Sequence, residues 1–190
     1  MKIDASTTDF SLIVNVHVPA ISSEVVYLKN WLFDWYGLSG DPNLDLQRRK
    51  DAPPTQSLAF VCSQGKTLGL LQGNPPPPPL GVSVFAPRVP LATRVSPGDE
   101  FRGRIALPVP LPEWTAYQTP KTDNVRPVSV QRIHLRLEYV RQSTCTYAKE
   151  LPAFRGVWQV SGQIESLEAT TSLDSPVILL ERRDAFKRFK

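Results

Sequence analysis

The chain has 190 residues, of which 41% are hydrophobic and 21% are charged. This length fits a single domain, and the apolar content is sufficient for a buried core, which excludes a disordered polyelectrolyte. Proline accounts for 19 of the 190 residues. That is about twice the usual ~5% and disfavours a bundle of long helices. We therefore expect one domain over residues 1–190, built mainly from β-strands.

The formal net charge is +4, and the basic excess lies in the middle of the chain. Residues 61–150 hold 11 lysines and arginines against 6 acidic residues. A surplus of this size is compatible with an acidic partner but does not identify one.

The N-terminal segment lacks the pattern of a targeting sequence. Two acidic residues precede its apolar run, and Asn15 and His17 interrupt that run, whereas a secretory signal has a basic start and an unbroken apolar segment. No stretch approaches the ~18 consecutive apolar residues that span a bilayer. Cys62 and Cys145 are the only cysteines. We expect a cytoplasmic protein with no membrane partner and two reduced, buried thiols, although a bridge between them stays open.

The first part of the chain contains several short strand patterns. Residues 24–28 and 31–36 predict two strands, and the polar residues 37–56 predict a long loop. Residues 10–18 alternate in hydrophobicity, which predicts a strand with a core face formed by Phe10, Leu12, Val14, Val16 and Val18.

A hairpin and a proline-rich connection are expected next. Residues 57–63 and 67–72 predict paired strands joined through a Gln-Gly-Lys turn. Residues 73–79 include five consecutive prolines, which form polyproline II and cannot donate ladder hydrogen bonds. This stiff segment is expected to carry the chain from one sheet to the other, before a short strand at 81–86.

The second half of the chain shows the clearest alternation. Residues 91–107 predict two strands around Pro97-Gly98, because proline presets φ and glycine supplies a positive φ at the next position. Strands are also expected at 155–164 and 176–180, and helical spacing predicts a short amphipathic tail at 179–190. The longest strand, residues 128–140, is expected to alternate Ile133, Leu135, Leu137 and Tyr139 with Arg132, His134, Arg136 and Glu138 on a wet face.

These elements predict an all-β fold, a two-sheet antiparallel β-sandwich with long proline-rich loops. The segment around Pro97-Gly98-Asp99 resembles the strand–turn–strand of many immunoglobulin-like and arrestin-like sandwiches. The resemblance covers only 91–107, and it implies an architecture and no activity.

Catalytic and metal-binding motifs are incomplete. Gly65-Lys66-Thr67 resembles the end of a phosphate-binding loop but lacks its first glycine and following helix. Two histidines and two cysteines without a short ligand pair do not predict a metal site, and no cofactor is expected. A nucleophile pair of Cys145 with His17 or His134, and acid–base work by Glu113, Glu165 and Glu168, stay open.

Two surfaces remain as candidate binding sites. The first is a basic strand face made of Arg102, Arg104, Arg132 and Arg136, which would share one surface if their strands are neighbours. The second is the aromatic row of Trp31, Phe33 and Trp35, which is typical of core packing and, if exposed, of a partner platform.

We therefore expect a non-catalytic protein-interaction or assembly module, a subunit or adaptor of a larger complex. It would dock a protein partner through the basic strand face and the aromatic and proline-rich loops. The alternatives are an enzyme or ligand-binding protein with a site in a barrel mouth or between the sheets, and a nucleic-acid-binding β domain.

Overall fold

The computed structural model describes the backbone of residues 1–20, 23–34, 55–56, 58, 60–75, 88–115, 125–152 and 154–182. Within these segments nearly all regular structure is extended, and the one helical element is the short 3₁₀ turn η1 (Gln142–Thr144). The all-β prediction is confirmed. In the same segments, no helix has the length and apolar character needed to cross a membrane.

The smaller of the two sheets has three antiparallel strands. They are β1 (Lys2–Thr7), β2 (Ser11–Val18) and β8 (Phe101–Pro108), in the order β1-β2-β8. The pairing runs without a register shift along all eight residues of β8.

The larger sheet contains the remaining eleven strands. Its main path is β10 (Trp114–Thr115), β5 (Phe60–Gln64), β6 (Thr67–Gln72), β11 (Val125–Arg141), β3 (Val26–Asp34), β7 (Arg88–Val95), β13 (Val157–Gly162) and β12 (Cys145–Glu150). Three further strands join from the side: β14 (Glu165–Arg182), β9 (Leu111–Pro112) and β4 (Thr55–Gln56). The sheet is mixed rather than wholly antiparallel, because β11 runs parallel to β6 and β14 parallel to β9.

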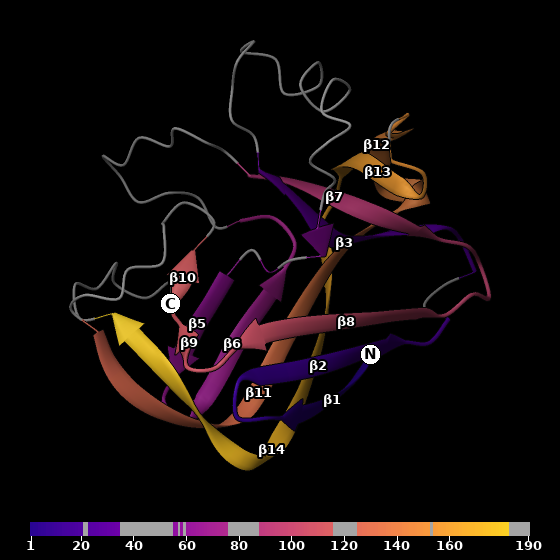
Figure 1. Cartoon of the computed structure of the whole chain (residues 1–190). Coiled ribbons are helices and arrows are strands. Elements are labelled where there is room, and N and C mark those ends of the chain that lie inside the picture. The colour runs from indigo at the N-terminus through magenta and orange to yellow at the C-terminus, as the bar shows by residue number, and fades with distance from the viewer. Residues whose placement is uncertain are drawn as a thin grey trace.

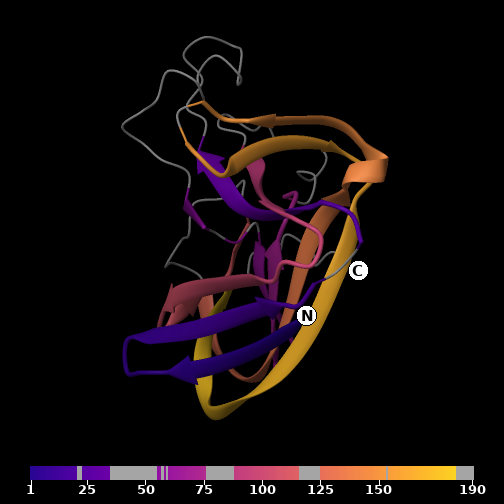
Figure 2. The ribbon, with the colours of Figure 1, turned by 90° about the vertical axis from the view of Figure 1, so that its right-hand side faces the viewer.

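The two sheets face each other across one main core. The long strands β11 and β14 pair over most of their lengths and curl beneath the small sheet (Figures 1 and 2). Side chains of β2 meet those of β11 in this core, including Leu12, Val14, Ile133 and Leu135, each with no exposed surface. Burial of these β-branched and leucine side chains is the main stabilising contribution.

The alternation patterns locate most strands correctly. The hairpin expected at 57–63 and 67–72 is β5 and β6, and the buried face of 128–140 is confirmed in β11. Phe10 is the exception in the first strand: it is 82% exposed. The strand begins only at Ser11, because the Thr8 hydroxyl accepts from the amides of Phe10 and Ser11 and holds a turn.

Several predicted boundaries are wrong. The strands expected at 24–28 and 31–36 form one strand, β3, up to Asp34. The strand expected at 176–180 extends from Glu165 to Arg182, so residues 179–182 are extended and not the start of a helix. The rest of the tail (183–190), the strand at 81–86, the proline run from 76 on and most of the loop at 37–56 lie outside the described residues.

The turn at Pro97-Gly98 connects the two sheets. Gly98 has φ +81°, as the sequence predicts, and Asp99 N donates to Ser96 O at 3.1 Å. The flanking strands do not pair with each other: β7 lies in the large sheet and β8 in the small one. This crossover leads directly into the candidate site.

Candidate functional site

The four arginines predicted to share one basic face lie on two different sheets. Arg102 and Arg104 are exposed on β8, whose only partner among the described strands is β2. Arg132 and Arg136 are exposed on β11, which pairs with β14, β6 and β3. The condition for a single four-arginine surface is therefore not met, because β8 and β11 belong to different sheets in the described part of the chain.

The aromatic row is only partly described. Trp31 is half-buried and packs against the small cluster of Leu91, Leu151 and Val157. Its indole Nε1 donates to Thr93 Oγ1 at 2.8 Å, so Trp31 is a packing residue with a satisfied polar atom. The backbone of Phe33 pairs with β7, while Trp35 lies outside the described residues.

A groove opens where the chain crosses from the large sheet to the small one. It encloses about 640 Å³ and is lined by the end of β7, the acidic residues after the Pro97-Gly98 turn, the start of β8 and the loop before β13. Arg94, Arg102 and Arg155 lie on its walls together with Asp99 and Glu100. Phe101, at one wall, is buried, so the groove has polar walls around apolar core residues.

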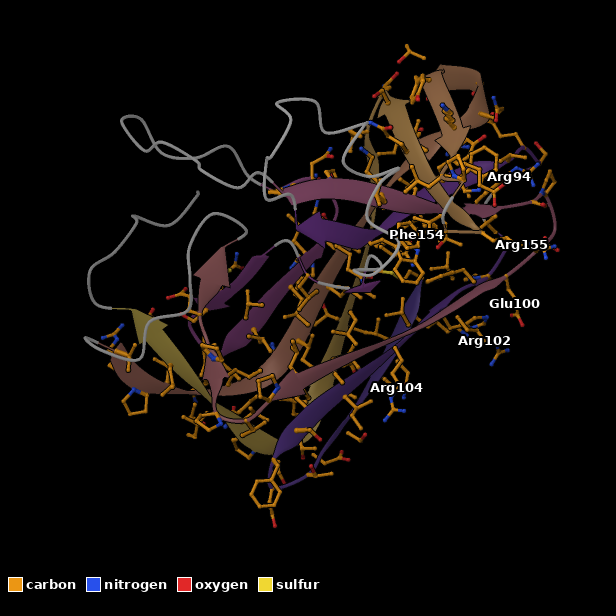
Figure 3. All side chains as sticks on the ribbon, turned by 45° about the horizontal axis from the view of Figure 1, so that its top comes forward. Arg94, Glu100, Arg102, Arg104, Phe154 and Arg155 are labelled. Atoms are coloured by element: carbon orange, nitrogen blue, oxygen red, sulfur yellow. The ribbon has the colours of Figure 1, made fainter. Side chains whose placement is uncertain are left out.

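Four arginines lie along this side of the molecule, and we call them the arginine band: Arg94, Arg102, Arg104 and Arg155. Figure 3 shows Arg94, Arg155, Arg102 and Arg104 following one another, with Glu100 between Arg155 and Arg102. All four are exposed. The band therefore includes two of the residues singled out from the sequence and adds two that were not.

The charges of the band are only partly compensated. Arg102 donates through Nε and one terminal nitrogen to Glu100 Oε1, at 3.2 and 2.9 Å. Arg94 donates to the neutral hydroxyl of Ser96. Arg104 and Arg155 have no hydrogen bond or ion pair with any residue that the structure describes. Within the described part of the chain, these two guanidinium groups are thus not engaged by a carboxylate.

Two hydrogen bonds favour the ionised form of Glu100. Its hydrogen bond with Arg102 holds the pKa of the Glu100 carboxyl below its usual range, and the hydrogen bond with His17 acts in the same direction. His17 Nε2 lies 2.6 Å from Glu100 Oε2. This carboxylate pairs with Arg102, whereas Arg104 has no carboxylate partner among the described residues.

Comparisons of the chain with models of protein families, with curated proteins and with solved structures found no match. What the site does is therefore argued from its own residues.

The catalytic arrangements left open by the sequence are not assembled in the described segments. The Cys145 thiol, on β12, donates to the backbone oxygens of Tyr147 and Ser161. His134 lies 3.3 Å from Glu168, and Glu165 is held by Arg141 and Tyr139. The described residues also contain no group of three side chains suited to a metal ion. Cys62 and Cys145 are half-buried, unbridged thiols.

A second polar cluster lies inside the fold, at a bulge of β3. Lys29 and Asn30 stand where the pairing of β3 with β7 shifts register, and both are buried, with 5% and 0% of their surface exposed. Lys29 Nζ donates a hydrogen bond to the side-chain Oδ1 of Asn74 at 2.9 Å, and the backbone N–H of Asn74 donates one to the carboxylate of Glu138. A bulge redirects side chains from their regular alternation, which explains two consecutive inward polar residues.

This cluster corrects one prediction and identifies one unpaired donor. Glu138 was expected on a solvent-exposed face, but it is only 7% exposed. Its carboxylate accepts a hydrogen bond from the backbone N–H of Asn74. Asn30 Oδ1 accepts from the amide and the hydroxyl of Thr93. Asn30 Nδ2 is buried without a hydrogen-bond partner among the residues that the structure describes, which is costly unless the position has a structural or binding role.

Replacing Lys29 by methionine will change how stability depends on pH. Burial lowers the pKa of Lys29 from 10.5, opposed by the charge of Glu138. The unfolded chain then keeps this proton to higher pH than the folded one, so wild-type stability rises between the lowered folded pKa and 10.5. We expect the stability of wild type relative to Lys29→Met to rise between pH 7 and pH 10, by at most about 1.4 kcal/mol per pH unit.

Urea unfolding of both proteins at each pH measures this difference. Lys149→Met, which removes an exposed lysine, serves as the reference for loss of a surface charge. A difference between wild type and Lys29→Met that stays constant with pH would show that the burial of Lys29 does not alter its proton affinity.

Two residues of the arginine band were missed by sequence reasoning. Arg94 alternates with buried Val95 on β7, which marks it as outward-facing. Arg155 precedes Gly156, whose φ of +81° marks a turn. Arg94 belongs to the basic excess of residues 61–150 and Arg155 follows that segment, but only the fold brings the two beside β8.

Proposed function

We propose that this chain is a protein-interaction module that docks an acidic partner on the arginine band. The observation that supports the proposal is the position of Arg104 and Arg155. Both are exposed, on the same side of the molecule, without a compensating carboxylate among the described residues. Guanidinium groups form planar, bidentate pairs with carboxylates, so an unpaired cluster of them favours an acidic protein surface.

In this proposal the chain acts as an adaptor or subunit rather than as an enzyme. The arginines orient the partner, and the groove beside them supplies area that becomes buried on docking. A protein partner is favoured over a nucleic acid by the aromatic residues. The exposed large hydrophobic residues in the described segments are Phe10, Tyr147 and Ile178, and none lines the groove. Trp31 does line it but is half-buried against the small cluster, whereas single-stranded nucleic acids are usually bound by stacking on exposed rings.

A labelled nine-residue peptide in which glutamate alternates with threonine tests this proposal by fluorescence anisotropy. We expect binding at low salt and a loss of about fivefold to tenfold in affinity for Arg104→Glu, because one attractive contact becomes repulsive. Arg132→Glu is the matched control. It makes the same change in net charge at another exposed arginine, on the large sheet, and is expected to alter the affinity by less than about twofold.

Two results would contradict the proposal. Equal losses for Arg104→Glu and Arg132→Glu would indicate attraction to net charge without a site. Tighter binding of a single-stranded oligonucleotide than of the peptide, weakened by Arg104→Glu and by salt, would favour nucleic-acid binding instead.

A further inference from the structure

One edge of the small sheet is open as far as the structure describes the chain. Strand β8 pairs with β2 on one side and with no strand on the other among the described residues. The opposite edge of the same sheet, β1, lies against β14. Figure 1 shows β8 along the margin of the small sheet. An unpaired edge presents backbone donors and acceptors to which another extended chain can pair.

The register identifies which backbone groups face this open side. Val109 N donates to Phe10 O at 3.0 Å, so the pair formed by these two residues is hydrogen-bonded. Bonded pairs recur at every second position of an antiparallel ladder, and the register of β2 with β8 is unbroken. The ladder with β2 therefore uses Gly103 and Ile105, while the amides and carbonyls of Arg102, Arg104 and Ala106 point away from β2.

The residues with outward backbone groups also carry the charges. Arg102 and Arg104 lie two positions apart on the same exposed face of β8, and such positions are about 6.6–6.8 Å apart along a strand. A strand paired to this edge would place its own alternate side chains directly beside them. Among the described residues, one terminal nitrogen of Arg102 has no hydrogen-bond partner. No nitrogen of the Arg104 guanidinium is hydrogen-bonded to a described residue.

Strand β8 lacks a feature that protects another edge of the molecule. Strand β12, at the end of the large sheet, has a register shift between Cys145 and Tyr147, and such bulges hinder pairing. No shift interrupts β8. Its arginines nevertheless disfavour pairing with a second copy, because antiparallel β8 strands would bring like charges together.

We propose that an extended acidic segment of a partner protein adds to β8 as a fourth, antiparallel strand of the small sheet. Its alternate carboxylates lie beside Arg102 and Arg104, and its backbone bonds to the outward groups of the same two residues. This inference rests on the proposed function and specifies the partner of that site. A carboxylate-bearing strand matches both the pitch and the charge of the edge, whereas a DNA backbone has no hydrogen-bond donors for the outward carbonyls of β8.

N-methylated peptides test the inference. In the proposed pairing, the glutamates of the alternating peptide stand opposite Arg102 and Arg104, so their own amides face β8 and the threonine amides face solvent. We expect N-methylation of the glutamates to weaken binding by at least about tenfold, since two or more hydrogen bonds are lost. N-methylation of the threonines is the matched control, because it leaves charge and composition equal, and we expect less than about a threefold change.

Amide hydrogen exchange supplies a second readout on the protein itself. At saturating peptide, the amides of Arg102, Arg104 and Ala106 should exchange at least about tenfold more slowly than in the free protein. The amides of Gly103 and Ile105, which already bond to β2, should change little.

The outcomes separate this inference from the proposed function. If both N-methylated peptides bind as well as the plain one and the three amides stay unprotected, strand addition is wrong, while docking through arginine side chains stands. If the plain peptide does not bind at all, both are wrong. Protection of the same amides by raising the concentration of protein alone would replace the acidic partner with a second copy of the chain.

Discussion

Replacing Gly162 by alanine is expected to destabilise the fold by roughly 3–5 kcal/mol. A Cβ at this position would lie 2.6 Å from the carbonyl oxygen of Thr144 and 2.9 Å from the Cα of Cys145. These are backbone atoms of the paired segment and cannot rotate away as a side chain would. The φ of +159° adds a conformation that side chains rarely adopt. The hairpin of β12 and β13 must therefore separate or distort.

Gly98→Ala separates the cost of the steric contact from the cost of the positive φ. Gly98 also has a positive φ, +81°, but a Cβ there meets nothing within 4 Å, so only the conformational cost of about 1–2 kcal/mol is expected. Urea unfolding followed by circular dichroism gives both values. If the two variants lose the same stability, the close approach of Thr144 to Gly162 is not a constraint of the folded state.

Local alternation was sufficient to place most strands. The buried residues of β2, and those of β11 from Ile133 to Leu137, follow period two in the sequence and share one core. The Pro97-Gly98 turn was predicted from backbone preferences alone and has the expected positive φ. These features depend on residues that are neighbours in the chain, which is why one sequence suffices to find them.

Strand neighbours were not predictable in this way. Arg132 and Arg136 show the same alternation as Arg102 and Arg104, yet β8 joins β2 in one sheet and β11 joins β14 in the other. Pairing between segments far apart in the chain depends on the competition among all strands for partners, and alternation does not encode it. The predicted basic face therefore divided into two separate pairs.

The bulge of β3 shows the limit of alternation within a single strand. A regular strand would send either Lys29 or Asn30 to solvent, but the register shift against β7 buries both. The sequence signal was present as a polar pair inside the apolar run of residues 25–31. The pair falls between the two strands predicted at 24–28 and 31–36, and a bulge and a break interrupt the alternation alike.

Arg155 depends on a small core that is separate from the main one. Leu91 has no exposed surface and contacts Leu151 and Val157, with Trp31 and Phe154 packed against them. Three backbone hydrogen bonds among residues 151–157, from Leu151, Phe154 and Val157, close the loop that carries Arg155. The position of this arginine is thus set by apolar packing beneath the groove, and not by an ion pair with a described residue.

Leu91→Ala should therefore reduce both stability and acidic-peptide affinity. Removing a fully buried leucine costs about 2–5 kcal/mol, and the loss falls on the cluster that supports the loop of residues 151–157. We expect the alternating glutamate peptide to bind about threefold to fivefold more weakly, since a displaced Arg155 guanidinium contributes less to an ion pair. Leu68→Ala is the matched control, because Leu68 is equally buried but belongs to the main core on β6. It should lose similar stability and keep its peptide affinity. Equal losses of affinity in both variants, measured where both remain folded, would show that the small cluster has no specific role in positioning Arg155.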